Sequence, residues 1–403
     1  MIEICQHDSC TGCFACENIC PKRCISMVPD SLGALHPVID QDNCIECLLC
    51  KNTCPNNRII EYSNPIECYA GWRTDKDKRK FSASGGIGAV LSEHVISNGG
   101  VVVGTSYDDN IVPVTTVAYD FNGIEKFKGS KYVQSLIGKS FSQIRDLLTM
   151  GKQILYIATP CQISGLLSFL KKPYDNLITV DLICHGVCPT SYFTDEITHL
   201  SNKKHIANIS NVTFRGNIRE KFNFQLNYSL TIFDGQRVVF NRPAMQEYYF
   251  AGFLKGITLR ENCYKCQYAR PERVSDITIG DFIGIGKDYP FDGPENVSII
   301  TANSKKGSQF IQNVQKECGE TLKLVERQYS EAIKYGPSLC APFPRHELTD
   351  RFQALYPRLG FIKTIRRLLF RSVVSDRVHF WYRLLCIAAP KKLYRIITSR
   401  ICR

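Results

Sequence analysis

The chain reads Cys10-Thr-Gly-Cys13-Phe-Ala-Cys16-Glu-Asn-Ile-Cys20-Pro21, and Cys44-Ile-Glu-Cys47-Leu-Leu-Cys50-Lys-Asn-Thr-Cys54-Pro55 follows it 34 residues later. Both runs have the spacing C-x2-C-x2-C-x3-C-P. The short x2 spacings let one loop wrap three thiolates around a cubane, while the fourth cysteine points away from it. The two runs therefore predict a ferredoxin module that holds two [4Fe-4S] clusters.

In such a module the two runs exchange their fourth ligands. We expect the first cluster to take Cys10, Cys13, Cys16 and Cys54, and the second to take Cys44, Cys47, Cys50 and Cys20. Zinc is the competing interpretation, because tetrahedral sulfur sites hold either metal. Zinc modules use two CxxC units for each ion. These eight cysteines instead form two groups of four, and a proline follows the last cysteine of each group. A ferredoxin module by itself moves electrons and has no substrate chemistry.

The composition is that of a globular protein, with 44% hydrophobic and 22% charged residues among 403. Neither a secretory signal nor an apolar run of about 18 residues occurs, so we expect a cytoplasmic protein without a transmembrane helix. In that compartment, twenty cysteines indicate metal ligands or redox chemistry rather than disulfides.

Strand and helix patterns alternate after the ferredoxin module. Strands are predicted at 100–104, 154–158 and 177–183, with helices after residue 85 and over 163–170, which is a βαβ pattern. Polar and apolar residues alternate over 223–233, and the turn signal Asp234-Gly235 follows, which indicates a hairpin. The fold class is therefore α+β. The predicted domains are a dicluster ferredoxin domain (1–62), a larger α/β body (66–345) and a helical basic tail (351–403).

The body carries further cysteines whose roles the residues alone leave open. Cys161 and Cys184 follow predicted strands, where chemistry tends to lie in such sheets. From the residues alone, small buried thiols at strand ends are the favoured explanation. Cys263-Tyr-Lys-Cys266 is half a zinc site, a redox disulfide or two ligands of a cluster.

Short motifs follow one another along the body. They are Ser82-Ala-Ser-Gly-Gly86, Gly129-Ser-Lys-Tyr-Val-Gln-Ser135, Ala158-Thr-Pro-Cys-Gln-Ile163, Asp181-Leu-Ile-Cys-His-Gly186, Asn262-Cys-Tyr-Lys-Cys-Gln-Tyr-Ala269 and Asp276-Ile-Thr-Ile-Gly-Asp-Phe282. In these motifs and their order the chain resembles the coenzyme F-420 hydrogenase/dehydrogenase beta-subunit family, in the bacterial form with an N-terminal 2x[4Fe-4S] ferredoxin domain.

The resemblance implies an oxidoreductase whose body binds FAD and an additional [4Fe-4S] cluster. It implies Cys161, Cys184, Cys263 and Cys266 as the ligands of this third cluster, with Cys188 as a competitor for Cys184. Electrons would pass from the ferredoxin clusters through the third cluster and FAD to a two-electron acceptor, or in reverse. The acceptor in archaeal members is coenzyme F-420, which a bacterial form need not use.

The flavin contacts are expected in two motifs and at one strand end. The predicted contacts are Ser84, Gly85, Gly86, Lys131, Tyr132, Gln134, Ser135 and Thr159. A Ser-Gly-Gly turn that opens a helix offers free N–H groups to a pyrophosphate, although a plain helix cap has the same sequence. For the second motif, Gly129 to Ser135, the alternative interpretation is a surface loop without a ligand. His185 is the candidate proton donor, and its alternative role is a hydrogen bond to a cluster or to backbone.

From Arg351 to Arg403 there are thirteen Lys or Arg residues and one acid, Asp376, while the rest of the chain is neutral. Phe361 to Val374 reads as a basic amphipathic helix. This pattern suits an anionic membrane surface on the inner face of the membrane, or helices docked on the body or in an oligomer interface. Nucleic acid is disfavoured because no recognition motif occurs.

Three functions compete. The first is a flavin-dependent iron–sulfur enzyme with a small-molecule acceptor and a redox partner, such as a ferredoxin or a dehydrogenase subunit. The others are an electron-transfer subunit that needs a catalytic partner, and a silent accessory of a biosynthetic complex. The size of the body and its four thiols favour the enzyme.

Overall fold

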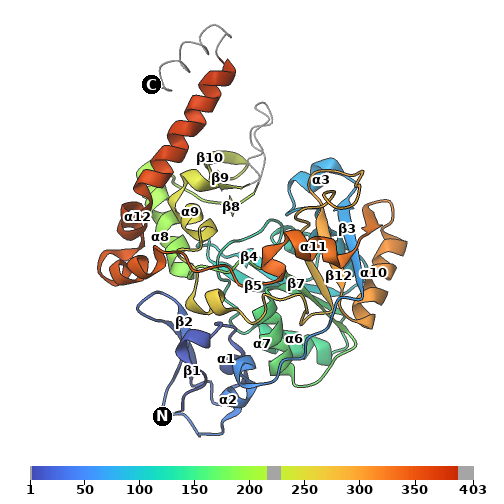
Figure 1. The fold of residues 1–403 in the computed structure, drawn as a ribbon. Helices are drawn as coiled ribbons and strands as arrows, with labels where there is room; N and C mark the ends of the chain where they lie inside the picture. Colours follow the sequence, from blue (N-terminus) through green and yellow to red (C-terminus); the bar gives the residue numbers. More distant parts are fainter. Residues whose placement is uncertain (1, 216–227, 389–403) are drawn as a thin grey trace.

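The fold was obtained as a computed structural model, which describes residues 2–215 and 228–388. Its N-terminal module contains η1 (His7–Ser9), α1 (Ala15–Ile19), α2 (Leu49–Thr53) and η2 (Pro55–Asn57). Strands β1 (Ile25–Pro29) and β2 (Leu35–Ile39) form an antiparallel hairpin between the helices. This module is the blue part at the bottom of Figure 1.

The 34-residue repeat of the sequence is also a repeat of backbone conformation. Phe14 (φ 61°) and Leu48 (φ 58°) precede α1 and α2 and are both left-handed. Gly12 (φ 61°) and Glu46 (φ 53°) are left-handed too, again 34 residues apart. The two cysteine loops therefore follow the same path, as two equivalent cluster-binding loops require.

The body is built on an eight-stranded sheet with the order β13-β3-β12-β11-β7-β6-β4-β5. Its centre is parallel and consists of β4 (Val101–Tyr107), β6 (Ile154–Ala158), β7 (Leu177–Leu182) and β11 (Ile277–Asp281). Antiparallel strands flank it: β5 (Pro113–Ala118), β12 (Ser298–Ala302), β3 (Glu67–Arg73) and β13 (Leu322–Glu326). The three predicted strands are confirmed, and with them the α+β class.

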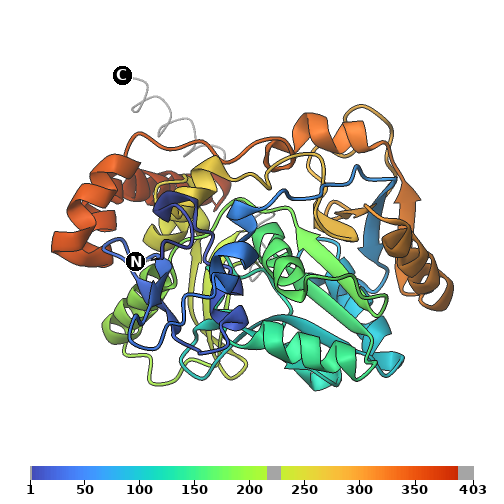
Figure 2. The same cartoon turned by 90° about the horizontal axis from the view of Figure 1, so that it is seen from below.

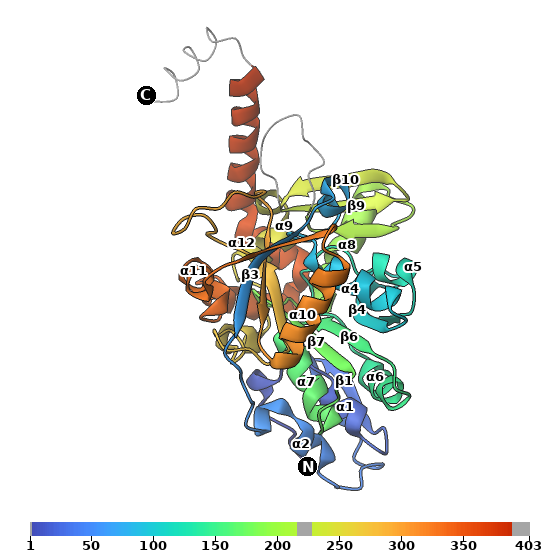
Figure 3. The ribbon, with the colours of Figure 1, turned by 90° about the vertical axis from the view of Figure 1, so that its right-hand side faces the viewer.

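Helices cover both faces of this sheet. One face is covered by α4 (Ile87–Ser97), α5 (Phe121–Glu125) and α10 (Lys305–Glu317). The other buries α6 (Ser140–Thr149) and α7 (Pro160–Leu170), and the same core includes Phe14 and Ala15 of the ferredoxin module. In Figures 2 and 3 the ferredoxin helices lie against α7. Helices α11 (Tyr329–Tyr335) and η6 (Pro337–Leu339) share a smaller core with β3 and β12, and α3 (Lys76–Lys80) contacts β3.

A second layer packs beside the sheet. It contains the antiparallel strands β8 (Asn211–Thr213), β9 (Ser229–Asp234) and β10 (Arg237–Pro243). Its helices are α8 (Thr190–Lys204), η4 (Ala244–Gln246), α9 (Tyr248–Leu254) and η5 (Glu261–Lys265). The hairpin predicted at Asp234-Gly235 is confirmed as β9 and β10, while residues 223–227 of that prediction lie outside the described residues.

Helix α12 (Thr349–Ala388) is kinked at Gly360, whose φ of 69° and ψ of 174° are not helical. Beyond the kink its apolar residues Phe361, Ile365, Leu369 and Val373 are buried in the core that α8 and α9 also line. The basic amphipathic stretch is therefore docked on the body, which was the alternative to a membrane surface. Membrane contact stays a prediction, and residues 389–403 lie outside the described part.

No helix in residues 2–215 and 228–388 combines the length and the hydropathy that a membrane span requires. In Figure 1 the last turns of α12 project away from the body.

Candidate functional site

The four cysteines predicted for the second cluster line one cavity of the ferredoxin module. They are Cys20, Cys44, Cys47 and Cys50, and the cavity is closed by apolar residues that include Ile25 and Ile39. Burial raises the pKa of the Cys50 thiol, and the charges of Cys47 and Cys20 add to this effect. Cys20 thus lies with the second run of cysteines, as the exchange of ligands requires.

The thiols predicted for the first cluster are also gathered. Burial raises the pKa of Cys16, and the charges of Cys13 and Cys10 raise it further. The hydrogen bond that the Cys10 thiol donates to Cys5, and then burial, raise the pKa of Cys10 to about 12. Such crowded thiols become thiolates when a metal binds them. The donor set therefore fits an iron–sulfur cluster.

The spacing pattern does not reveal two further thiols beside these sets. Cys5 is hydrogen-bonded to Cys10 and Cys54, and Sγ of Cys24 lies 3.5 Å from Sγ of Cys20. Both fall outside the C-x2-C-x2-C-x3-C-P runs, so only the folded structure places them there.

In the body, Cys161, Cys184, Cys263 and Cys266 are brought together from three segments. Burial raises the pKa of Cys161, and the charges of the other three thiols raise it further. For the same reasons the pKa of Cys184 rises to about 12. Cys188, the competitor for Cys184, is fully buried, and its Sγ lies 3.1 Å from Thr258 Oγ1. The geometry therefore favours Cys184 in this group.

A cavity of about 280 Å³ borders this thiol group at the carboxyl ends of the parallel strands. Cys161 and Cys184 are on its wall, together with Thr11 from the first ferredoxin loop. Open α/β sheets bind ligands at this end of their strands. The cavity thus lies between the ferredoxin module and the sheet, where a cofactor would reach both.

Comparison with known proteins gives two family matches. Residues 9–57 match the family described as 4Fe-4S dicluster domain. Residues 151–326 match the family described as the C terminus of the coenzyme F420 hydrogenase/dehydrogenase beta subunit. Along the chain, the match to the dicluster family therefore precedes the match to the beta-subunit family. The predicted resemblance is confirmed, and the chain is an iron–sulfur electron-transfer protein of the oxidoreductase type.

Among solved structures, one similar chain comes from the F420-reducing [NiFe] hydrogenase complex of Methanosarcina barkeri. It is 14% identical, with a TM-score of 0.43, and the match covers 78% of the present chain and 95% of that chain. No curated protein sequence matches.

Helix α7 of the beta-subunit domain connects two thiol sets. It carries Cys161 in its first turn, and Gly165 follows one turn later. A Cβ atom on Gly165 would lie 2.8 Å from Cβ and 3.0 Å from Sγ of Cys13. Because one helical turn rises about 5.4 Å, a first-cluster thiol and a body thiol lie close together along α7.

Replacing Gly165 by valine is expected to push Cys13 away from α7, at a cost of about 1–3 kcal/mol for overpacking. The paramagnetic signal of the reduced first cluster should change or disappear, as measured by electron paramagnetic resonance. Leu167→Ala alters an exposed residue of the same helix and should leave that signal unchanged. An unaltered signal in Gly165→Val would contradict the close packing of Cys13 on α7.

Of the predicted flavin contacts, all but one line the cavity. Those on its wall are Ser84, Gly86, Lys131, Tyr132, Gln134, Ser135 and Thr159. Gly85 is not on the wall. Its N–H donates to Ser298 Oγ at 2.9 Å, and a Cβ there would lie 2.3 Å from the carbonyl oxygen of Gly71. Gly85 therefore serves the close packing of the turn against the sheet.

The side chains of Gln134 and Ser135 are hydrogen-bonded within the protein. Gln134 accepts from Arg260 at 2.6 Å and donates to the Gly12 carbonyl at 3.4 Å. Ser135 Oγ accepts from Gln162 at 2.9 Å. Gln134 thus connects the body to the first cluster loop, a role that the sequence did not indicate.

Lys131 lies on the inner wall of the cavity. Its Nζ donates to the carbonyls of residues 126–129 at 3.2 to 3.4 Å. Burial lowers the pKa of Lys131 to about 7. The side chain can therefore hold or release a proton near neutral pH.

Arg215 and Asp281 form a further part of the wall. Two Arg215 nitrogens donate to the Asp281 carboxylate, at 2.8 and 2.5 Å, and its Nε donates to Tyr132 OH at 2.7 Å. Burial would raise the pKa of Asp281, but the hydrogen bonds and charge of Arg215 lower it overall. The pair fixes Tyr132, so its role includes positioning a predicted contact.

His185 is on the cavity wall, and its ring packs between Phe253 and Phe343. Its Nε2 lies 3.2 Å from the Phe253 carbonyl. Burial lowers the pKa of His185, although this carbonyl opposes the shift. The neutral ring donates through Nε2–H, so proton donation to a bound molecule would have to use Nδ1. The role of His185 as proton donor stays a prediction.

Proposed function

We propose that the chain is an iron–sulfur flavoprotein oxidoreductase. In this proposal electrons pass from the two ferredoxin clusters through a third [4Fe-4S] cluster and FAD to a two-electron acceptor, or in reverse. One observation carries the proposal: a cavity bordered by Cys161 and Cys184 also reaches Thr11 of the first cluster loop. A ferredoxin that only relayed electrons would not need such a cavity.

The third cluster would be held by Cys161, Cys184, Cys263 and Cys266. Four mutually interacting thiols supply the number of ligands that a cubane needs. Arg273 favours their charged forms, since its charge lowers the pKa of Cys184 and Cys266 against the raising effect of burial. A donor set of this kind fits iron better than it fits a buried hydrophobic packing role.

FAD would lie in the cavity beside these thiols. The cavity volume of about 280 Å³ is close to the lower end of the range for ligand sites. Gly88 and Ala89 in the first turn of α4 are on the wall, next to the N-cap Gly86, so free N–H groups of the helix start are available to a phosphate. A bound flavin supplies the exchange between one-electron and two-electron chemistry.

The residues around the cavity would divide the remaining tasks. Lys131 holds a proton at Nζ within the cavity, and the Arg215–Asp281 pair orients Tyr132. Gln134 and Arg260 hold the first cluster loop against the body, so the distance from that loop to the cavity is fixed. Tuning of a cofactor by such hydrogen bonds and by burial is the protein's usual contribution to redox chemistry.

The redox partner would dock at the second cluster. Cys47 is exposed there, and the neighbouring Ile45 and Leu48 are 57% and 44% exposed. An apolar surface next to a cluster suits a transient contact with a ferredoxin or a dehydrogenase subunit. The proposed order of transfer is then partner, second cluster, first cluster, third cluster and flavin.

Replacing Gly88 by leucine tests the flavin site. A Cβ on Gly88 would make only ordinary contacts, the nearest at 3.4 Å from Ile279, so α4 should fold while the longer side chain fills the cavity. We expect flavin content to fall at least about 10-fold, a loss of about 1.4 kcal/mol in binding, with iron content unchanged. Flavin released by denaturation is measured by fluorescence.

The matched control is Ser97→Leu, which adds the same side chain at the exposed end of α4 and should retain flavin. Equal flavin in Gly88→Leu and in the unmodified chain would refute this cavity as the flavin site. Absence of flavin from all three proteins would refute the flavoprotein proposal.

A further inference from the structure

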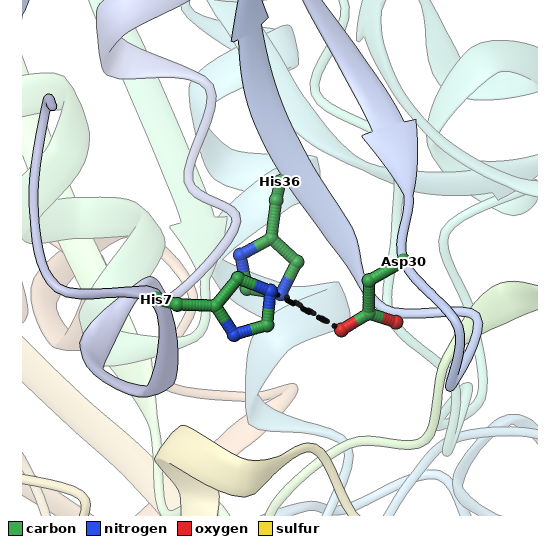
Figure 4. A group of neighbouring side chains, drawn as sticks. All are labelled: His7, Asp30 and His36. Carbon is green, nitrogen blue, oxygen red and sulfur yellow. Dashed lines mark ion pairs between the residues drawn. The ribbon is translucent and has the colours of Figure 1, made fainter. Parts of the chain in front are cut away.

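Three potential metal ligands converge in the ferredoxin module, apart from the cysteine loops. His7 comes from η1, Asp30 follows β1, and His36 lies in β2 (Figure 4). Nε2 of His36 is 3.3 Å and Nε2 of His7 is 3.5 Å from Oδ2 of Asp30. One ligand atom from each residue lies within 4.8 Å of the others. Neither the cluster proposal nor the flavin proposal uses these side chains.

The hairpin backbone holds Asp30 through one of its two carboxylate oxygens. Oδ1 of Asp30 accepts from the N–H groups of Leu32 and Ala34, at 2.8 and 2.9 Å. The turn rests on α8, because a Cβ on Gly33 would lie 2.5 Å from Ser191 Oγ. The carboxylate is therefore fixed through Oδ1, and Oδ2 faces the two imidazole rings.

The distances fit a shared ion better than direct hydrogen bonds. Charge-assisted N–H···O bonds are about 2.7–2.9 Å long, shorter than the 3.3 and 3.5 Å observed. Two ligands bound to zinc at about 2.0–2.1 Å with a tetrahedral angle lie about 3.3–3.4 Å apart. Two histidines and a carboxylate are also a ligand set that zinc and ferrous iron use in proteins.

We propose that His7, Asp30 and His36 bind one divalent transition-metal ion of the zinc type. His7 Nδ1 lies 3.2 Å from Asp8 Oδ1, and a metal-bound histidine commonly donates its second N–H to a carboxylate in this way. The two rings are now nearly parallel, with centroids 3.7 Å apart. Binding requires His7 to turn so that both lone pairs converge, and its side chain is 59% exposed, so nothing rigid prevents this.

Three protein ligands leave one coordination position open, as in catalytic rather than structural zinc sites. The three side chains line a cavity of about 250 Å³, whose lining also includes Tyr192, Glu261 and Arg345. The open position thus faces a space between the ferredoxin module and the second layer. A water or a small anion is the chemical class that would complete the coordination.

The test uses the anaerobically purified chain with its clusters, and zinc alone as the probe. Asp30→Asn keeps the oxygen that holds the turn and replaces the other oxygen with an NH2 group, which does not bind metals. His7→Gln removes a ligand at an exposed position, so it remains informative if Asp30→Asn fails to fold. His36 is left intact because it also hydrogen-bonds the Cys10 thiol.

Zinc and iron are measured by elemental analysis after equilibrium dialysis, and the zinc affinity by competition with a chromophoric chelator. We expect one more zinc per unmodified chain than per variant, at equal iron content. Loss of an outer-shell partner costs about 10–100-fold in metal affinity, so loss of a ligand should cost at least about 100-fold. His205→Asn, which changes another exposed histidine, should bind zinc like the unmodified chain. Equal zinc in the unmodified chain and both variants, or no zinc in any of them, would overturn the proposal.

Discussion

Replacing Cys263 by serine is expected to remove about four of about twelve irons per chain, since one cubane holds four. Cys263 is 8% exposed, and its pKa is raised to about 11, first by burial and then by the charge of Cys266. A serine hydroxyl is a poor substitute for a thiolate that ligates iron in a buried site. Iron and sulfide analysis of the anaerobically purified protein measures the loss.

The matched control for this prediction is Cys188→Ser. Cys188 is fully buried and lies close to the four thiols of the proposed third cluster, but its own thiol is hydrogen-bonded to Thr258. It should therefore retain about twelve irons. A loss of four irons in Cys188→Ser together with full iron in Cys184→Ser would show that the fourth ligand was assigned to the wrong cysteine.

Replacing Arg273 by methionine is expected to lower the free energy of unfolding by about 3–5 kcal/mol, the usual cost of breaking a buried ion pair. Its Nη2 lies 2.9 Å from Asp181 Oδ1, and the two side chains are 1% and 0% exposed. Its other nitrogens donate to Thr278 and to the carbonyls of Tyr268 and Arg270. Loss of Arg273 leaves the Asp181 charge buried near the end of β7, three residues before Cys184.

Arg270→Met is the control, because Arg270 forms an ion pair of similar length with Glu272 at the surface. Exposed pairs contribute about 0–1 kcal/mol. Anaerobic thermal unfolding followed by circular dichroism should show a clearly lower midpoint for Arg273→Met than for Arg270→Met. Equal midpoints would mean that the buried pair does not stabilise the thiol site.

Local patterns in the sequence were sufficient to predict the ferredoxin module and the strands of the central sheet. The cluster loops depend on spacings of two and three residues, so the predicted exchange of Cys20 and Cys54 between the two clusters follows from the repeat itself. The parallel strands are short apolar runs between turns, and burial on both faces makes such runs recognisable. These features need no knowledge of which distant segments meet.

Features that depend on contacts between distant segments could not be predicted from local sequence patterns. The amphipathic pattern around Ile365 and Leu369 indicates an apolar face but does not tell which surface covers it, and the structure shows the core beside α8 and α9. Gln134 lies in a motif expected to contact flavin, yet its amide bridges Gly12 and Arg260. The division at residues 62, 66, 345 and 351 stays a prediction.

The grouping of His7, Asp30 and His36 illustrates the same limit. Only the register of the β1–β2 hairpin, with Val28 opposite His36, places the second histidine beside the carboxylate. His7 reaches them from a separate segment. No spacing rule relates the three positions, whereas the C-x2-C pattern relates the cluster ligands directly.

The central claim is that this chain is a three-cluster flavoenzyme rather than a two-cluster electron carrier. Anaerobic purification followed by iron, sulfide and flavin analysis tests it most directly. We expect about twelve irons, about twelve sulfides and one FAD per chain, from three cubanes and one flavin. About eight irons and no flavin would contradict this claim and leave only the ferredoxin module as the redox-active part.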